Sequence, residues 1–156
     1  MTPPVEISLA PVDPGRPEAQ GCLRAYEAEL DQRFAGGFDV ARSRAVEVDD
    51  VRPPAGRFLL ATRGGEPVGC VGLKLHEGWG EIKRMWVDPT ARGTGLGRRL
   101  LGAVEAEARA AGVPVVRLDT NAGLTEAIGL YRSAGFVEVR AYNDEPYADL
   151  WFEKRL

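Results

Sequence analysis

The chain has 156 residues, which is the size of one ordinary domain with room for a single sizeable core. Its formal net charge is -3, and basic residues are interleaved with acidic ones along most of the sequence. The chain therefore lacks the strongly basic patch that is typical of proteins that bind nucleic acid or anionic membranes. We therefore expect one domain over residues 1–156, with neither nucleic acid nor a membrane as partner.

The N-terminal part of the sequence predicts one strand and two helices. Residues 1–19 lack the basic stretch followed by an apolar one that marks a targeting signal, and the alternation in residues 5–11 predicts a strand. The glycines of FAGGFDV end a helix predicted over residues 16–34, and a second helix is predicted near residues 40–50. The first helix is predicted from apolar side chains at helical spacing: Cys22, Leu23, Tyr26 and Leu30.

The middle of the chain predicts a hairpin, a further strand and a helix. Residues 57–76 hold two apolar runs around Gly64 and Gly65, which is the signature of a β-hairpin. A strand over residues 81–87, EIKRMWV, leads into a glycine-rich segment. The helix after that segment ends at Gly112, and its apolar side is formed by Leu96, Leu100, Val104, Ala108 and Ala111.

The C-terminal part predicts three strands and one more helix. A strand over residues 113–120 is followed by a short helix over residues 125–135. Two closing strands, residues 136–142 and 148–156, are joined by the turn-rich residues 143–147. Together the elements amount to about seven strands and four helices, a fold of the α/β or α+β kind.

The cysteines and the length of the apolar runs indicate the cellular compartment in which the protein is expected. We expect the two cysteines, Cys22 and Cys70, to be small buried side chains in a reducing compartment, not a disulfide or metal ligands. No run of the roughly 18 apolar residues that span a membrane occurs. These observations favour a soluble, cytoplasmic protein that needs no metal.

The segment DPTARGTGLGRRLL, residues 88–101, places three glycines within five positions directly before a predicted helix. Glycines let the backbone approach a ligand closely, and the free N–H groups of a helix N-terminus favour an anion, most often a phosphate. The P-loop and dinucleotide-binding patterns both fail, because each requires a glycine where Arg98 stands. The pattern that remains is Arg92-x-x-Gly95-x-Gly97; a tight turn without any ligand is the alternative.

Two separated segments, EIKRMWVDPTARGTGLGRRLL and EAIGLYRSAGF, resemble the acetyl-CoA-binding core of the GNAT superfamily of N-acetyltransferases. The order of the other predicted elements agrees with that family over nearly the whole chain. The resemblance implies an α+β fold of the α/β/α sandwich type, in which a mixed, mostly antiparallel, splayed sheet of about seven strands is flanked by about four helices. It also implies acetyl-CoA as the cofactor.

The resemblance places acetyl-CoA along the glycine loop and the strand before it. In the family the pyrophosphate lies across the loop, where a side chain at Gly95 or Gly97 would hold the phosphates away. The pantetheine arm pairs with the splayed strand, here at Met85 and Val87, and the Val87 N–H would polarise the thioester carbonyl.

One feature departs from the family pattern, which has an asparagine where this sequence has Leu124, three residues before Ala127. Asn121 lies further back, and it either reaches the cofactor or forms the turn before the helix with Thr120. The arginines of the loop either add charge for the phosphates or are simply solvated. The implied cofactor-binding residues are Met85, Trp86, Val87, Arg92, Gly93, Thr94, Gly95, Leu96, Gly97, Arg98, Asn121 and Tyr131.

Direct acyl transfer needs a base for the amine and an acid for the departing thiolate. The resemblance implies that Glu81 takes the amine proton, directly or through water, and that Tyr131 protonates the thiolate; with the Val87 N–H these are the implied catalytic groups. The alternatives are a solvated strand end where Glu81 pairs with Lys83, and a core aromatic at Tyr131. We expect His76, the single histidine, to be exposed and not catalytic.

The acceptor is expected to be a primary amine of a small molecule. Peptide or protein N-terminal acetylation and a non-catalytic acyl-CoA-binding sensor are the alternatives. The basic candidates would hold a carboxylate or phosphate of the substrate, and the tyrosines would either wall the amine site or pack under a loop. The apolar terminal strand favours a homodimer. The candidate substrate-binding residues are Tyr26, Lys83, Arg84, Tyr142 and Tyr147.

Overall fold

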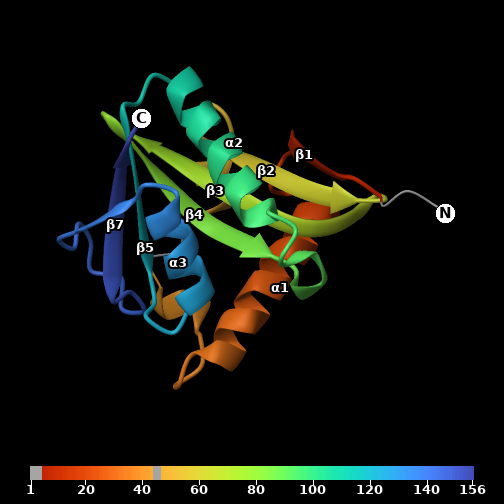
Figure 1. Ribbon diagram of the computed structural model, residues 1–156, viewed down its shortest axis with the longest axis horizontal. Helices are drawn as coiled ribbons and strands as arrows, with labels where there is room; N and C mark the ends of the chain where they lie inside the picture. Colours follow the sequence, from red (N-terminus) through yellow and green to blue (C-terminus); the bar gives the residue numbers. More distant parts are fainter. Residues whose placement is uncertain (1–4, 44–46) are drawn as a thin grey trace.

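The computed structural model describes residues 5–43 and 47–156, and they form a seven-stranded sheet (Figure 1). The order across the sheet is β1-β2-β3-β4-β5-β7-β6, and each neighbouring pair is antiparallel except β4 and β5. The mixed, mostly antiparallel sheet that the sequence predicts is therefore confirmed. The strands are β1 (Ile7–Pro11), β2 (Gly56–Arg63), β3 (Glu66–His76), β4 (Trp79–Val87), β5 (Val115–Thr120), β6 (Val137–Val139) and β7 (Leu150–Arg155).

Helices cover both faces of the sheet. Because the side chains of a strand point alternately to its two sides, one strand can contribute apolar side chains beneath both helical layers. Phe58 and Leu60 of β2 pack in one cluster with Cys22 of α1, whereas Leu59 and Ala61 join the core beneath α2 and α3. In the described residues, none of the helices has both the length and the apolar character needed to cross a membrane. The α-helices are α1 (Pro17–Arg33), α2 (Leu96–Ala110) and α3 (Thr125–Ser133).

The helix predicted near residues 40–50 is wrong. The Asp39 side chain accepts a hydrogen bond from the N–H of Ala41, 3.0 Å away, and Glu47 and Asp50 bond each other's backbone N–H groups. Such local bonds compete with a continuous α-helix, so the described residues hold three α-helices where the sequence predicts four. Two short 3₁₀ helices form instead, η1 (Val40–Arg42) and η2 (Val48–Val51), on either side of residues 44–46, which lie outside the described part of the chain.

The strand predicted over residues 136–142 is shorter than expected, since β6 ends at Val139. Beyond it the chain leaves the sheet and turns over the ends of β4 and β5. The Tyr142 hydroxyl lies 3.4 Å from a carboxylate oxygen of Glu81, and the Asn143 amide donates to Asp119 at 2.8 Å. These polar contacts draw the segment off the edge of the sheet.

The sheet splays between β4 and β5. The two strands pair at only two positions, Gly80 with Val116 and Glu81 with Arg117, and then diverge. In the part of the chain that the structure describes, the edge of β4 that faces β5 therefore has no strand to pair with beyond Glu81. The splayed sheet implied by the resemblance is confirmed.

A β-bulge on the other edge of β4 accompanies the splay. The register between β3 and β4 shifts between Cys70 and Gly72, and Arg84, opposite this shift, adopts a φ of 57°. An extra residue in one strand bends it and increases its local twist. Cys70 packs beneath the bulge as a free, buried thiol, and Cys22 is likewise free and buried, as the sequence predicts.

Candidate active site

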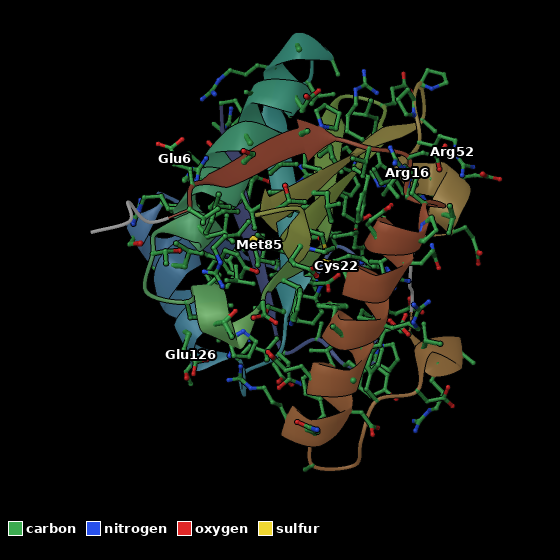
Figure 2. All side chains as sticks on the ribbon, turned by 90° about the vertical axis from the view of Figure 1, so that its right-hand side faces the viewer. Glu6, Arg16, Cys22, Arg52, Met85 and Glu126 are labelled. Carbon is green, nitrogen blue, oxygen red and sulfur yellow. The ribbon has the colours of Figure 1, made fainter. Side chains whose placement is uncertain are left out.

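Two cavities open along the diverging strands. The first, the glycine-loop groove, lies between α1, α3 and the loop that joins β4 to α2 through the 3₁₀ helix η3 (Pro89–Ala91). The second, the β4–β5 cavity, lies between these strands, the end of α1 and the segment before β7. In Figure 2, Met85 of β4 lies between α1 and η3. Six residues line both cavities: Tyr26, Leu30, Met85, Leu124, Ala127 and Tyr131.

Gly93 and Gly95 shape the loop of the first groove. Both have left-handed backbone conformations, with φ of 82° and 84°, and nothing lies within 4 Å of the position that a Cβ would take at either residue. Gly95 is the N-cap of α2, and no side chain caps this helix end. An open backbone cradle beside a helix N-terminus has the geometry and partial charge that suit a phosphate.

Gly97 has a different environment. A Cβ at this position would lie 2.8 Å from Cδ2 of Leu130 in α3 and 3.7 Å from the terminal methyl of Met85. The close approach of α2 to the Leu130 side chain is therefore a further reason for glycine here, beside the clearance for phosphates that the sequence suggests.

A chain of ion pairs borders the groove. Arg92 donates from Nε to the carbonyl of Val87 at 3.1 Å and places its guanidinium 2.5 Å from Glu29 of α1. Arg33 lies 3.6 Å from the same Glu29 and 2.7 Å from Glu126 of α3. The Arg92 side chain is thus not simply solvated, because it connects the loop to α1.

All of the residues implied for acetyl-CoA line the glycine-loop groove except Thr94 and Asn121. The Thr94 hydroxyl donates to the carbonyl of Ala91 within the loop, at 2.6 Å. Asn121 lines the β4–β5 cavity instead; its amide donates to the carbonyl of Tyr147, and its oxygen accepts from the N–H of Gly123, both at 2.8 Å. Asn121 therefore stabilises the turn before α3.

Tyr131 lies where the two cavities meet. It is 7% exposed, and its ring packs against those of Phe136 and Phe152, with centroids 6.0 Å and 6.1 Å away. Burial, with a smaller contribution from the nearby charge of Asp119, raises the pKa of Tyr131 to about 12. The hydroxyl therefore keeps its proton at neutral pH and can donate it.

Glu81 is 6% exposed and belongs to a buried polar network, not to a solvated strand end. One carboxylate oxygen lies 3.0 Å from Nε2 of His76, and the other lies 3.2 Å from the Lys83 ammonium and 3.4 Å from the Tyr142 hydroxyl. The prediction that His76 is exposed is wrong, because the imidazole ring is half-buried and stacks on the Trp79 ring with centroids 4.0 Å apart. The pairing of Glu81 with Lys83 is present, but inside the protein.

Lys83 and Asp119 lie on the cavity side of this network. Both line the β4–β5 cavity, whereas Glu81 is not among its lining residues. The Lys83 ammonium is 3.3 Å from Oδ2 of Asp119; burial alone would lower the pKa of Lys83, but the charges of Asp119 and Glu81 raise it overall. Sequence reasoning missed Asp119, whose only signal is a carboxylate near the end of a predicted strand, VVRLDT.

Aromatic side chains form one wall of the β4–β5 cavity. The Tyr147 ring stacks on Phe34, with centroids 5.6 Å apart, and lies 4.9 Å from Phe38, while its hydroxyl accepts a hydrogen bond from the N–H of Asp39 at 2.9 Å. We call Phe34, Phe38 and Tyr147 the aromatic wall. Tyr26 lines the same cavity, as expected, but Tyr142 does not.

Comparison with known families agrees with this geometry. The model of the family described as "Acetyltransferase (GNAT) family" matches residues 22–136, which include α1 from Cys22 onward, β2 to β5, the glycine loop, α2 and α3. The chain belongs to the GNAT family of acetyltransferases.

Individual relatives carry several acceptor names. This GNAT chain is 38% identical over 133 residues to the IAA acetyltransferase of Azospirillum brasilense, an alignment that covers 82% of the chain and 86% of that protein. It is 35% identical over 140 residues to a mycothiol acetyltransferase of Thermobispora bispora, covering 85% of the chain. The chain spans only 47% of that second relative's length.

Solved structures share the fold at lower sequence identity. A GNAT acetyltransferase from Staphylococcus aureus Mu50 superposes with a TM-score of 0.81 at 17% identity, covering 96% of this chain and 99% of that one. A GNAT acetyltransferase from Elizabethkingia anophelis, solved with acetyl-CoA bound, gives a TM-score of 0.66 at 19% identity and covers 96% of this chain and 98% of that one. The fold implied by the sequence resemblance is confirmed.

Proposed function

We propose that this acetyltransferase, acting as a single domain over residues 1–156, moves an acetyl group from acetyl-CoA directly to a primary amine of a small molecule while both are bound. The observation that carries the proposal is the junction of the two cavities at Tyr131. A donor in the glycine-loop groove and an amine in the β4–β5 cavity would meet beside that hydroxyl, so no acetylated enzyme is needed.

The groove residues fit acetyl-CoA, which supplies the acetyl group as an activated thioester. The N–H groups at the start of α2 would hold the pyrophosphate in the open space beside Gly93 and Gly95. Because none of the described strands pairs with the edge of β4 beyond Glu81, the backbone of Met85 and the N–H of Val87, whose carbonyl accepts from Arg92, would be available to the pantetheine arm. The Val87 N–H would be the oxyanion donor for the thioester carbonyl.

Two side chains move protons in this mechanism. Tyr131, whose hydroxyl is protonated at neutral pH, donates to the departing thiolate. Glu81 accepts the proton of the amine. Since Lys83 and Asp119 lie between Glu81 and the cavity, the proton reaches Glu81 through water or these side chains rather than directly.

A small acceptor is favoured over a polypeptide by the aromatic wall. The contacts of Tyr147 with Phe34, Phe38 and the N–H of Asp39 join the segment after α1 to the segment before β7 across one side of the cavity. An extended peptide entering from this side would have to break them. The name of the Azospirillum brasilense relative, an IAA acetyltransferase, also supports a small acceptor.

The proposal is tested by incubating the purified chain with acetyl-CoA and separate panels of small amines and of short peptides. Free thiol is followed with a disulfide dye, and the product is weighed by mass spectrometry. We expect thiol release that depends on a small amine and a product heavier by one acetyl group. Acetyl-CoA binding without turnover on either panel would instead support a non-catalytic acyl-CoA-binding sensor. Turnover on peptides alone would support peptide or protein N-terminal acetylation.

The variant Gly95→Ala is expected to weaken acetyl-CoA binding by about 10- to 100-fold, or roughly 1.4 to 2.8 kcal/mol. Its methyl group would enter the open space of the cradle, and its left-handed backbone would be strained. Calorimetric titration of the folded variant measures the change. Gly102→Ala is the matched control, because Gly102 lies on the exposed side of α2 with nothing near its Cβ position, and its affinity should equal that of the parent.

The variant Glu81→Gln is expected to lose activity most at low pH. An alkylamine with a pKa near 10 is almost fully protonated at pH 7, so acceptance of its proton matters most there and becomes less important as the pH approaches 10. The rate of the variant relative to the parent, measured from pH 7 to 10, should therefore rise with pH. A ratio that stays constant over this range contradicts the role of Glu81 as proton acceptor; Glu66→Gln, an exposed acid in the hairpin turn, is the control.

A further inference from the structure

Among the described residues, the basic side chains that line the β4–β5 cavity already pair with carboxylates. Lys83 lies 3.2 Å from Glu81 and 3.3 Å from Asp119, and Arg84 lies 2.9 Å from Glu27 of α1. A phosphate or carboxylate of a substrate at Lys83 would have to sit beside two buried carboxylates of the same sign. The expectation from sequence that Lys83 or Arg84 holds an anionic group of the substrate is therefore disfavoured.

Asp119 has unused capacity to accept hydrogen bonds. Both of its side-chain contacts in the described residues, from Lys83 and from the amide of Asn143, fall on Oδ2. Oδ1 has no partner there, yet it is not among the buried polar atoms that lack one, so it is accessible in the cavity that Asp119 lines. Glu81, Lys83 and Asp119 carry one positive and two formal negative charges, so a bound ammonium would balance this group.

The aromatic wall supplies the other half of a recognition site. Phe34 and Phe38 present hydrocarbon surface, and the Tyr147 hydroxyl already accepts a hydrogen bond from the N–H of Asp39. The wall and Asp119 line the same cavity, which Tyr131 links to the glycine-loop groove. An apolar group between them would lose contact with water, and a nearby ammonium would gain from the ring faces as well.

We propose that the acceptor is an apolar amine, an aromatic or aliphatic group that bears one ammonium and no anion, with the ammonium on Oδ1 of Asp119 and the apolar body against Phe34, Phe38 and Tyr147. This inference rests on the proposed function, since it names the acceptor class for the same site. Asp119 acts in it as a binding residue, and the ammonium loses its proton afterwards by the route described above. The carboxylate repels acceptors that carry a second, negative group.

The test compares acceptors that differ in one group. Phenethylamine and phenylalanine share a ring and an amine and differ by a carboxylate, and 2-aminoethylphosphonate carries an anion without the ring. We expect kcat/KM to be at least about tenfold higher for phenethylamine than for either anionic amine, because the added anion is repelled by the carboxylate of Asp119 and, in 2-aminoethylphosphonate, the ring that would contact the aromatic wall is missing. A preference for an anionic amine overturns the inference and leaves the proposed function standing; no turnover with any amine, while acetyl-CoA binds, overturns both.

Variants of Asp119 and Phe38 test whether these two residues cause the preference for an apolar amine. Asp119→Asn keeps the shape and the contact with Asn143, and it should raise the KM for phenethylamine by about tenfold or more while the Kd for acetyl-CoA stays constant. Phe38→Ala should raise the KM for phenethylamine but not for ethylamine, which is too short to reach the wall. Glu66→Gln, far from the cavity, is the control for loss of an acid. An unchanged KM in Asp119→Asn, or equal effects of Phe38→Ala on both amines, contradicts the assignment.

Discussion

Replacing Tyr131 by phenylalanine is expected to lower kcat by about 10²- to 10⁴-fold, the usual loss when a general acid is removed. Only the hydroxyl disappears, because the ring retains its contacts with Phe136 and Phe152. The Kd for acetyl-CoA, measured by calorimetry, should therefore stay constant while steady-state turnover falls.

The pKa of Tyr131 adds a check on this result. Because burial raises it from the ordinary value of 10 to about 12, the hydroxyl stays protonated through the assay range, and its ionisation should not reduce the parent's rate below about pH 10. The same shift stabilises the folded protein below pH 10, and this contribution is lost as the pH rises through 12. Tyr147→Phe, which loses its bond to Asp39, should change the KM for the amine rather than kcat. Full turnover in Tyr131→Phe would exclude the hydroxyl as the acid.

Replacing Phe152 by alanine is expected to reduce the free energy of unfolding by about 3 to 5 kcal/mol. Phe152 of β7 is fully buried and is the register partner of Leu118 on the neighbouring strand β5. Its ring lies against the Tyr131 ring and the guanidinium of Arg132. The cavity left behind has α3 on one side, so the helix that carries Tyr131 loses the contacts of Phe152 with Tyr131 and Arg132. In a chain of this length the melting temperature should fall by roughly 10 °C.

Urea unfolding and thermal melts measure the Phe152→Ala effect. Val137→Ala on the neighbouring β6 is the control, because Val137 is 62% exposed and its truncation should change stability by no more than about 0.5 kcal/mol. If Phe152→Ala does not fold, Phe152→Leu should lose about 1.5 kcal/mol or less and still unfold in a single transition. Equal stability of Phe152→Ala and the parent would mean that this contact does not support α3.

Elements with a regular pattern could be read from the sequence. Four of the five apolar positions predicted for the helix of α2, Leu96, Leu100, Val104 and Ala108, are buried, whereas Ala111 is the partly exposed C-cap. The glycine loop was predictable because its geometry is set by neighbouring residues, with Gly95 at the start of α2. The segment around Asp39 was not, because short side-chain bonds to the backbone outweigh a weak helical pattern there.

The acceptor half of the site needed the three-dimensional structure. Asp119 and Lys83 are 36 positions apart and meet only because β4 and β5 are parallel neighbours. Likewise, nothing in the sequence indicates that Lys83 stands between Glu81 and the cavity, or that His76 folds back onto Glu81. Non-local contacts of this kind depend on strand order, which a single sequence does not specify.

The separation of β4 and β5 also affects how the acceptor specificity of such a protein can change during evolution. Much of the glycine-loop groove comes from one continuous stretch, residues 85–98, whereas the β4–β5 cavity draws its lining from α1, the loop after it, β4, β5, α3 and the segment before β7. Substitutions in those scattered segments can change the acceptor without altering the stretch that holds the donor. Selection on one substrate is thereby largely uncoupled from selection on the other, and the six residues common to both cavities are where the two constraints meet.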